Sequence, residues 1–306
     1  GHDILFFWVI RMLMMGYEFT GQTPFKEIYL HGLVFDDTGR KMSKSWGNVV
    51  DPLDVIDQYS TDALRLSCVL GNTPGNNLNF SVKNVEEYSL YLNKFWNIIR
   101  FVWMNIGDIT EERDVIEGRI LKNTDALLPY ERWILSRLSR TIENMTEGME
   151  DSSFSASGVE LLSFIRDEFA DFAIEAYKIE KNTSTLGKDV LSIITLDILA
   201  LLHPYAPHIT EMLYGYVTGG KLLITSDWPV SHFPIERSSE ASMNRIFDIV
   251  RVIRNIRAES KVPPSELRNI HIIPPSIYLN DIESNASLIV GMTRSSEIHI
   301  GEKPSK

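Results

Sequence analysis

The sequence is poor in cysteine, in long apolar runs and in positive charge. Its one cysteine, Cys68, excludes an internal disulfide and a cysteine-based zinc cluster, and it favours a reducing, cytoplasmic setting. The longest apolar run covers residues 4–10, far too few to span a bilayer, and no signal peptide is evident, so we expect no membrane partner. Lysine and arginine total 30 against 41 acidic residues, and this net charge of -11 argues against a nucleic-acid partner unless a local basic stripe exists.

What is present is the composition of an ordinary globular chain, with 44% hydrophobic and 23% charged residues. A length of 306 residues predicts about two domains. The sequence opens with Gly1, His2 and Asp3 and then a dense apolar segment, without an initiator methionine. We therefore expect a piece of a longer polypeptide.

The first 80 residues carry the signals of an α/β domain. Residues 4–15 are apolar almost all round, which predicts a helix buried in a core and ended by Gly16. Residues 27–35 predict a buried strand, and a polar loop over residues 40–48 follows it. Asp51 and then Pro52 predict the start of another helix. A strand and loop between helices are typical of the last part of an α/β sheet domain.

The middle of the sequence predicts an antiparallel helix bundle. Strand signals are absent from residue 81 to about residue 216, and apolar residues there recur at helical spacing. Short loops between amphipathic helices favour a bundle of four or five. The expected helices cover residues 81–101, a segment starting near 129, and residues 154–180, 188–202 and 208–217.

The last part of the sequence predicts a small α/β appendage. A helix is expected over residues 242–259, and strands over 269–273 and 297–300 flank a helix over 279–290. The fold class is therefore α+β and mainly α. We divide the chain into residues 1–80, 81–235 and 236–306.

The loop Lys41-Met42-Ser43-Lys44-Ser45 is the most unusual local sequence. Two lysines spaced by two residues, flanked by small hydroxyls and glycine, can wrap a polyphosphate, because ammonium groups and loop donors both bind its oxygens. The spacing of a Walker A loop is absent. A solvated basic turn is the alternative interpretation.

The loop resembles the KMSKS signature of the class I aminoacyl-tRNA synthetases. Its surroundings fit the same family in the same order: His31-Gly32 before the loop, residues 47–52 after it, and residues 62–65 in the following helix. Residues 1–8 resemble the valyl members of the family, because they lack the glutamine typical of isoleucyl enzymes. Further resemblance to valyl enzymes lies in residues 93–97, 131–138, 203–204, 209–211, 228–229 and 254–259.

The resemblance implies a Rossmann-type catalytic domain, of which residues 1–80 are the C-terminal part, followed by an anticodon-binding bundle and a connector. It implies ATP-dependent activation of valine to valyl-adenylate and transfer to tRNA(Val). ATP would enter with Mg2+ as a substrate complex, and no tightly bound cofactor is expected. The family's HIGH motif and editing domain are not in this sequence, so the remainder of the parent polypeptide is an expected partner and this chain alone is expected to be inactive.

The resemblance also assigns residues. It makes Lys41 and Lys44 catalytic, through contacts with the phosphates of ATP. The residues expected to bind ATP are Gly1, Asp3, His31, Gly32, Lys41, Met42, Ser43, Lys44 and Ser45. The valine pocket is assigned to Ile4 and Trp8, and tRNA binding to Lys83, Arg100 and Phe101.

Several of these residues have an equally ordinary structural interpretation. Asp3 can cap a helix, Ile4 and Trp8 can be core, and Phe101 can face the bundle interior. The two serines of the loop can shape it without touching a ligand. No metal site is expected, because His203 and His208 lack a third ligand nearby and suit helix-end packing better.

Two other functions stay open at this point. An isoleucyl- or leucyl-tRNA synthetase fragment would carry the same loop and bundle. A non-catalytic tRNA-binding module would use only the bundle and the connector.

Overall fold

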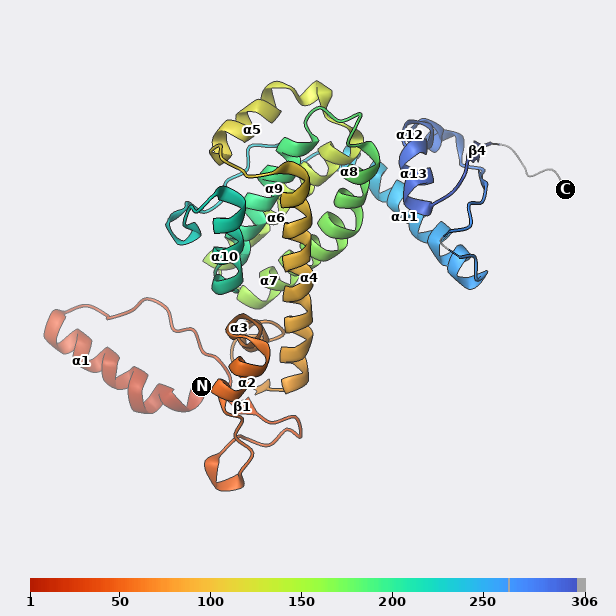
Figure 1. Ribbon diagram of the computed structural model, residues 1–306. Coiled ribbons are helices and arrows are strands. Elements are labelled where there is room, and N and C mark those ends of the chain that lie inside the picture. The colour runs from red at the N-terminus through yellow and green to blue at the C-terminus, as the bar shows by residue number, and fades with distance from the viewer. Residues whose placement is uncertain (264, 302–306) are drawn as a thin grey trace.

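The computed structural model describes residues 1–263 and 265–301 and is mostly helical. The described residues form two sheets of two strands each. Figure 1 shows helix α4 (Val82–Ile106) running from the N-terminal elements up into a group of helices, with the C-terminal elements on the far side of that group. Within the described residues, no helix has the length and apolar character needed to cross a bilayer.

The N-terminal helix is exposed, contrary to the sequence prediction. A 3-10 turn η1 (His2–Ile4) and a π-helical segment η2 (Leu5–Val9) lead into α1 (Ile10–Thr20). The helix does not end at Gly16 but at Gly21, whose φ of 67° reverses the chain in a left-handed conformation. Figure 1 shows α1 extending away from the rest of the molecule. It is exposed because an apolar helix is buried only where a second surface packs against it.

The strand predicted over residues 27–35 is much shorter. Only β1 (Val34–Phe35) pairs, in parallel, with β2 (Leu78–Asn79), which the sequence analysis missed. A β-strand extends only as far as its hydrogen-bonded partner, and β2 is two residues long, so β1 is equally short. The residues before β1 therefore run as irregular chain.

Helices α2 (Pro52–Tyr59) and α3 (Thr61–Val69) follow. As predicted, Asp51 caps α2, accepting a 2.9 Å hydrogen bond from the backbone N–H of Leu53. The buried carboxylate of Asp62 accepts the N–H groups of His208 and Ile209 at 3.3 and 2.7 Å. This contact ties the N-terminal elements to the start of helix α10 (Pro207–Thr218).

The central helices bury most of the core. Aromatic and aliphatic side chains such as Phe95, Trp133, Phe164 and Phe169 are almost completely inaccessible. The helices after α4 are α5 (Arg113–Lys122), α6 (Pro129–Glu150), α7 (Phe154–Ser163), η5 (Phe164–Ala173), α8 (Ile174–Glu180), α9 (Gly187–Leu202) and α10 (Pro207–Thr218). Short 3-10 turns lie at η4 (Thr124–Ala126) and η6 (Leu223–Thr225).

These helices agree closely with the predicted ones, with one omission. The segment expected over 154–180 is a continuous helical stretch in which η5 has π-helical hydrogen bonding. Helix α5 was missed because its few apolar residues form no clear stripe along the sequence, although Ile116 and Ile120 are buried.

The C-terminal elements form the expected parallel β-α-β unit. Helix α11 (Arg237–Glu259) precedes β3 (Ile270–Ile272), η7 (Ser276–Tyr278), α12 (Leu279–Ser284), α13 (Ala286–Thr293) and β4 (Ile298–Ile300). Strands β3 and β4 pair in register, with Ile270 opposite Ile298. The helix predicted over 279–290 is broken at Asn285 into α12 and α13.

Helix α11 also packs on the central helices. The ring of Phe247 lies 4.7 Å from that of Trp133 on α6 and 4.2 Å from that of Phe172. The Glu240 carboxylate accepts hydrogen bonds from Ser136 and Arg140 of α6. The start of the predicted segment 236–306 therefore packs into the core of the predicted segment 81–235.

Candidate functional site

The loop of residues 41–45 leaves β1 through a tight reversal. The N–H of Asp36 donates to Arg40 O at 2.8 Å, and Lys41 forms an antiparallel bridge with Phe35. The N–H of Met42 then donates to Val34 O at 3.2 Å. Residues 44–46 form the short 3-10 turn η3 (Lys44–Trp46). The loop is thus an ordered turn attached to the sheet edge.

Two side chains outside the five-residue signature hold the loop. Asp36 Oδ1 accepts hydrogen bonds from the Thr38 hydroxyl, the Thr38 N–H and the Arg40 N–H. Asn48 Nδ2 donates to Asp36 Oδ2 at 2.7 Å, and Asn48 Oδ1 accepts the N–H of Ser43 at 3.0 Å. Asn48 therefore joins the turn before the loop to the middle of the loop.

These hydrogen bonds stabilise the ionised form of the Asp36 carboxyl group. The hydrogen bond from the Asn48 amide is the largest cause, and those from Thr38 and Arg40 add to it, so that the pKa of Asp36 falls to about 2. Asp36 is consequently a carboxylate at neutral pH. The sequence analysis did not single out Asp36, and the signal that could have found it is its place between the strand and the loop.

The two lysines of the loop are exposed. Neither the Lys41 nor the Lys44 ammonium has a hydrogen-bond or ion-pair partner within residues 1–263 and 265–301. The hydroxyls of Ser43 and Ser45 lie 3.0 Å apart and bond each other. The ordered loop thus presents to solvent two cations that have no partner among the described residues, and its serine pair contributes to its shape.

Four of the residues assigned to ATP binding, Gly1, Asp3, His31 and Gly32, lie close together. The amino nitrogen of Gly1 is 3.4 Å from His31 Nε2, and His31 Nδ1 is 2.8 Å from Gly32 O. Asp3 is half-exposed within η1, whose N-cap is Gly1, so Asp3 does not cap that turn. Two distant stretches of sequence therefore meet at the start of the chain and before β1.

Gly32 has a close neighbour of its own. A Cβ atom at residue 32 would lie 1.6 Å from the carbonyl oxygen of Asn76. The neighbouring N–H of Leu33 accordingly donates to Asn77 Oδ1 at 3.1 Å. Glycine is required here because the segment before β2 crosses directly over it. This packing role exists whether or not a nucleotide also lies nearby.

The residues assigned to the valine pocket are not enclosed. Ile4 is 40% exposed and Trp8 61% exposed. The expectation that this segment is core is wrong for the described chain, since Val9 is the buried residue of the segment.

The three residues assigned to tRNA binding lie apart. Lys83 is in the first turn of α4 and lines a groove of about 470 Å³ with Asp36, Met42 and Asn48 of the loop region. It pairs with Glu87 at 4.0 Å. Arg100 lies 17 residues further on, which is about 25 Å along a helix. Lys83 therefore neighbours the loop, whereas Arg100 and Phe101 belong to the far half of α4.

Arg100 and Phe101 point to different helices. The Phe101 ring is half-buried against the core, and the Lys178 ammonium of α8 lies 4.6 Å from its centroid. Arg100 is exposed and lines a hollow of about 260 Å³ between α4 and α10. The two residues do not form one joint surface.

His203 behaves as a helix-end residue. Its Nδ1 lies 2.8 Å from the Thr210 hydroxyl, and burial lowers its pKa. Within the described residues no group of three or more His, Cys, Asp or Glu side chains is arranged to hold a metal ion.

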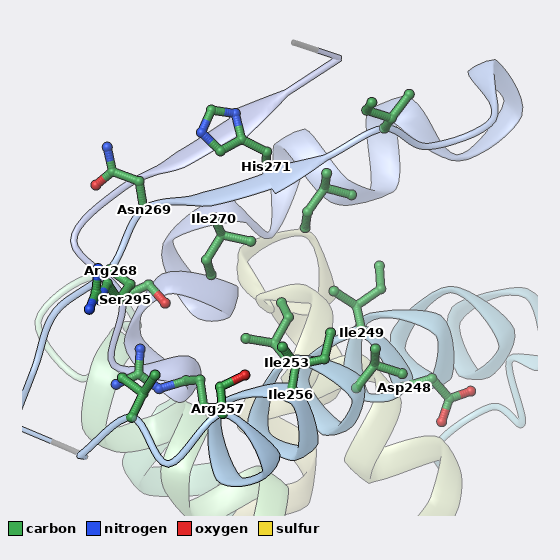
Figure 2. A pocket seen from close by; sticks show the side chains of 15 residues that line it. Asp248, Ile249, Ile253, Ile256, Arg257, Arg268, Asn269, Ile270, His271 and Ser295 are labelled. Carbon is green, nitrogen blue, oxygen red and sulfur yellow. The ribbon is translucent and has the colours of Figure 1, made fainter. Parts of the chain in front are cut away.

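An apolar hollow of about 660 Å³ lies between α11 and β3 (Figure 2). Figure 2 shows Ile249, Ile253 and Ile256 rising from α11 toward the strand, with Ile270 directed down at them and His271 on the other side. None of the sequence-assigned residues lines this hollow.

Comparison with known proteins agrees with these features. Residues 1–81 match the family described as tRNA synthetases class I (I, L, M and V), and residues 131–272 match the anticodon-binding domain of tRNA ligase. With both segments in their expected order, the chain belongs to the class I tRNA synthetases.

Within that class the chain is homologous to valine–tRNA ligases. The enzyme of Bacillus thuringiensis subsp. konkukian (strain 97-27) is 37% identical over 308 residues, which cover 98% of this chain and 34% of that protein. The enzyme of Geobacillus stearothermophilus is 41% identical over 273 residues, which cover 87% of this chain and 30% of that protein. The chain thus spans about a third of the length of these relatives.

A solved structure has a similar fold. It is the leucyl enzyme (LeuRS) of Agrobacterium radiobacter K84 agnB2 in a ternary complex with tRNA and LeuAMS. The match has a TM-score of 0.54 and 22% sequence identity, and it covers 75% of this chain and 27% of that one.

Proposed function

We propose that this chain is the part of a valine–tRNA ligase that carries the KMSKS loop and the anticodon-binding helices. The full enzyme would activate valine with ATP to valyl-adenylate and transfer the valyl group to tRNA(Val). The observation that carries this proposal is the ordered loop in a chain homologous to valine–tRNA ligases, with two exposed lysines that pair with none of the described residues.

Lys41 and Lys44 would act on the phosphates of ATP. Negative charge shifts toward the leaving pyrophosphate during adenylate formation. Cations placed there therefore stabilise the transition state more than they stabilise bound ATP. Because Asp36 and Asn48 hold the turn, the ammonium groups can move on their side chains without unfolding the loop. Mg2+ would arrive with ATP as part of the substrate.

Gly1, Asp3, His31 and Gly32 are proposed to form the nucleoside part of the ATP site, with Met42, Ser43 and Ser45 at its phosphate end. The Gly1–His31 contact supports this, because it joins both nucleoside elements in one place. The Asp3 carboxylate is suited to accept hydrogen bonds from ribose hydroxyls.

The exposed apolar helix supports the proposal that a further part of the enzyme lies beside it. Phe6, Phe7 and Trp8 are between 61% and 76% exposed, which is unusual for three consecutive aromatic residues on a protein surface. The HIGH-containing half of a class I catalytic domain would cover this face and enclose Ile4 and Trp8 as the valine pocket. The parallel pairing of β1 with β2 supports a Rossmann-type domain over residues 1–80.

We further propose that residues 81–235 bind the anticodon arm and that residues 236–306 act as a connector, with α11 packed on the bundle. Lys83, Arg100 and Phe101 remain the proposed tRNA contacts. A cytoplasmic setting is proposed from the lone reduced cysteine, Cys68. An isoleucyl or leucyl specificity is the alternative within the same class.

The test compares this chain with a longer polypeptide that adds the HIGH-containing half. The longer protein should show valine-dependent exchange of pyrophosphate into ATP and should charge tRNA(Val). This chain alone should show no exchange, because half of the ATP site is missing. Activation of isoleucine or leucine in place of valine by the longer protein would contradict the proposed specificity.

A further inference from the structure

The side of α4 that faces α10 carries a pocket of aromatic rings. Its volume is about 260 Å³, and its walls include Trp96, Arg100 and Trp103 of α4 and Tyr216 of α10. Tyr216 is 54% exposed and Trp103 38% exposed, so the pocket opens to solvent. Rings this large are seldom left exposed around a hollow unless something binds there.

The rings of this pocket are held in fixed positions. Trp96 and Tyr216 meet edge to face, with their centroids 5.9 Å apart and their planes at 90°. The indole N–H of Trp103 donates a 2.7 Å hydrogen bond to Asp108 Oδ1. The N–H of Ile109 donates to Val217 O at 2.7 Å, which fastens the end of α4 to the end of α10. The pocket is therefore formed before any ligand arrives.

Arg100 gives the pocket its charge. Its side chain is exposed, and it has no hydrogen-bond or ion-pair partner within the part of the chain that the structure describes. The nearby Asp108 carboxylate is engaged by the Trp103 indole. An apolar hollow lined by flat aromatic rings can stack a flat ring of a ligand. The exposed Arg100 guanidinium at its rim can bind an anionic backbone attached to that ring.

We propose that this pocket, formed by Trp96, Trp103 and Tyr216 with Arg100 at its rim, takes an unpaired base of the bound tRNA by stacking. The Arg100 guanidinium would hold the adjoining phosphate. The proposal rests on the tRNA partner proposed above and places a base on the α10 side of α4, away from Phe101, which faces α8. Aromatic faces with an arginine are the usual means of holding single-stranded bases.

The test measures binding of fluorescently labelled tRNA(Val) transcript to the chain and its variants. Tyr216→Ala should weaken binding about 5- to 150-fold, the equivalent of about 1–3 kcal/mol of lost stacking. Tyr216→Phe should bind like the parent, since it keeps the ring. Arg100→Ala should weaken binding and lower the slope of log affinity against log salt by about one.

Met104→Ala is the matched control, because Met104 is 71% exposed on the same helix and lies outside the pocket. All variants should be fully folded at the assay temperature, and thermal melting checks this. If the parent chain binds the tRNA but Tyr216→Ala binds it as tightly as Met104→Ala does, the pocket does not hold a base. This is also the result expected if the pocket instead binds a side chain of another protein. If the parent chain does not bind tRNA, both this inference and the proposed tRNA partner are wrong.

Discussion

The side-chain amide of Asn48 donates a 2.7 Å hydrogen bond to the carboxylate of Asp36, across the base of the lysine loop. The same side chain accepts the Ser43 N–H and lies 3.4 Å from Lys41 O. One asparagine thus contacts three points of a turn whose two lysine ammonium groups have no hydrogen-bond or ion-pair partner among the described residues. Asn48 therefore adds side-chain contacts to the backbone hydrogen bonds that already hold the loop.

Replacing Asn48 with alanine should therefore loosen the loop. The three contacts would be lost together, and Lys41 and Lys44 should become more susceptible to trypsin, because cleavage requires local opening. The measurement is the rate of limited proteolysis at these two lysines. Asn97→Ala is the control, since Asn97 on α4 donates only to Asn93 O. Equal cleavage rates in both variants would show that the loop is held by other means.

The order of the loop should also depend on pH. The pKa of Asp36 is lowered from 3.8 to about 2, so its ionised form stabilises the folded turn at any pH above about 4. That contribution should be lost as the pH falls through about 2. An NMR titration of the Asp36 carboxyl carbon would measure the midpoint. Asn48→Ala should raise the midpoint, since the largest cause of the shift is removed, and a midpoint near 4 in the parent chain would contradict the observed contacts.

Alanine at residue 32 should destabilise the N-terminal elements. Its Cβ would lie 1.6 Å from Asn76 O, so the segment before β2 must move and the β1–β2 pairing with it. We expect a loss of about 1–3 kcal/mol or more, the range for overpacked sites, measured by thermal unfolding. Gly118→Ala is the control: it lies in α5 with open space around its Cβ, and there alanine should be neutral or favourable. Equal stability of the two variants would show that the close approach of Gly32 is easily relieved.

Lys44→Ala in the longer enzyme should slow adenylate formation, on the order of 100-fold, with little change in valine binding. The reason is that the ammonium would act on charge that develops only as pyrophosphate leaves. Steady-state pyrophosphate exchange separates the two effects. Lys188→Ala, an exposed lysine at the start of α9, is the control. A defect confined to valine affinity would rule out the assigned role.

Features that depend on near neighbours along the chain were predictable. The Asp51 cap of α2 and the helices over 129–150 and 187–202 agree with expectation because caps and helical periodicity act within a few residues. The loop over residues 41–45 was found for the same reason, since its lysines and serines are adjacent in sequence. Helix α5, in contrast, has no apolar stripe of its own, and its burial depends on α9.

Tertiary structure decided which of these residues meet and which are covered. The amino-acid sequence by itself determined most helices between residues 81 and 218, the lysine loop and the apolar character of residues 4–15. Only the fold decided that this apolar segment is exposed, that Gly32 lies under Asn76, and that Arg100 joins the rings of α4 and α10 while Phe101 faces Lys178. Periodicity states which side chains favour burial, but burial and contact require a second surface, and where that surface lies is set by residues far away in the chain.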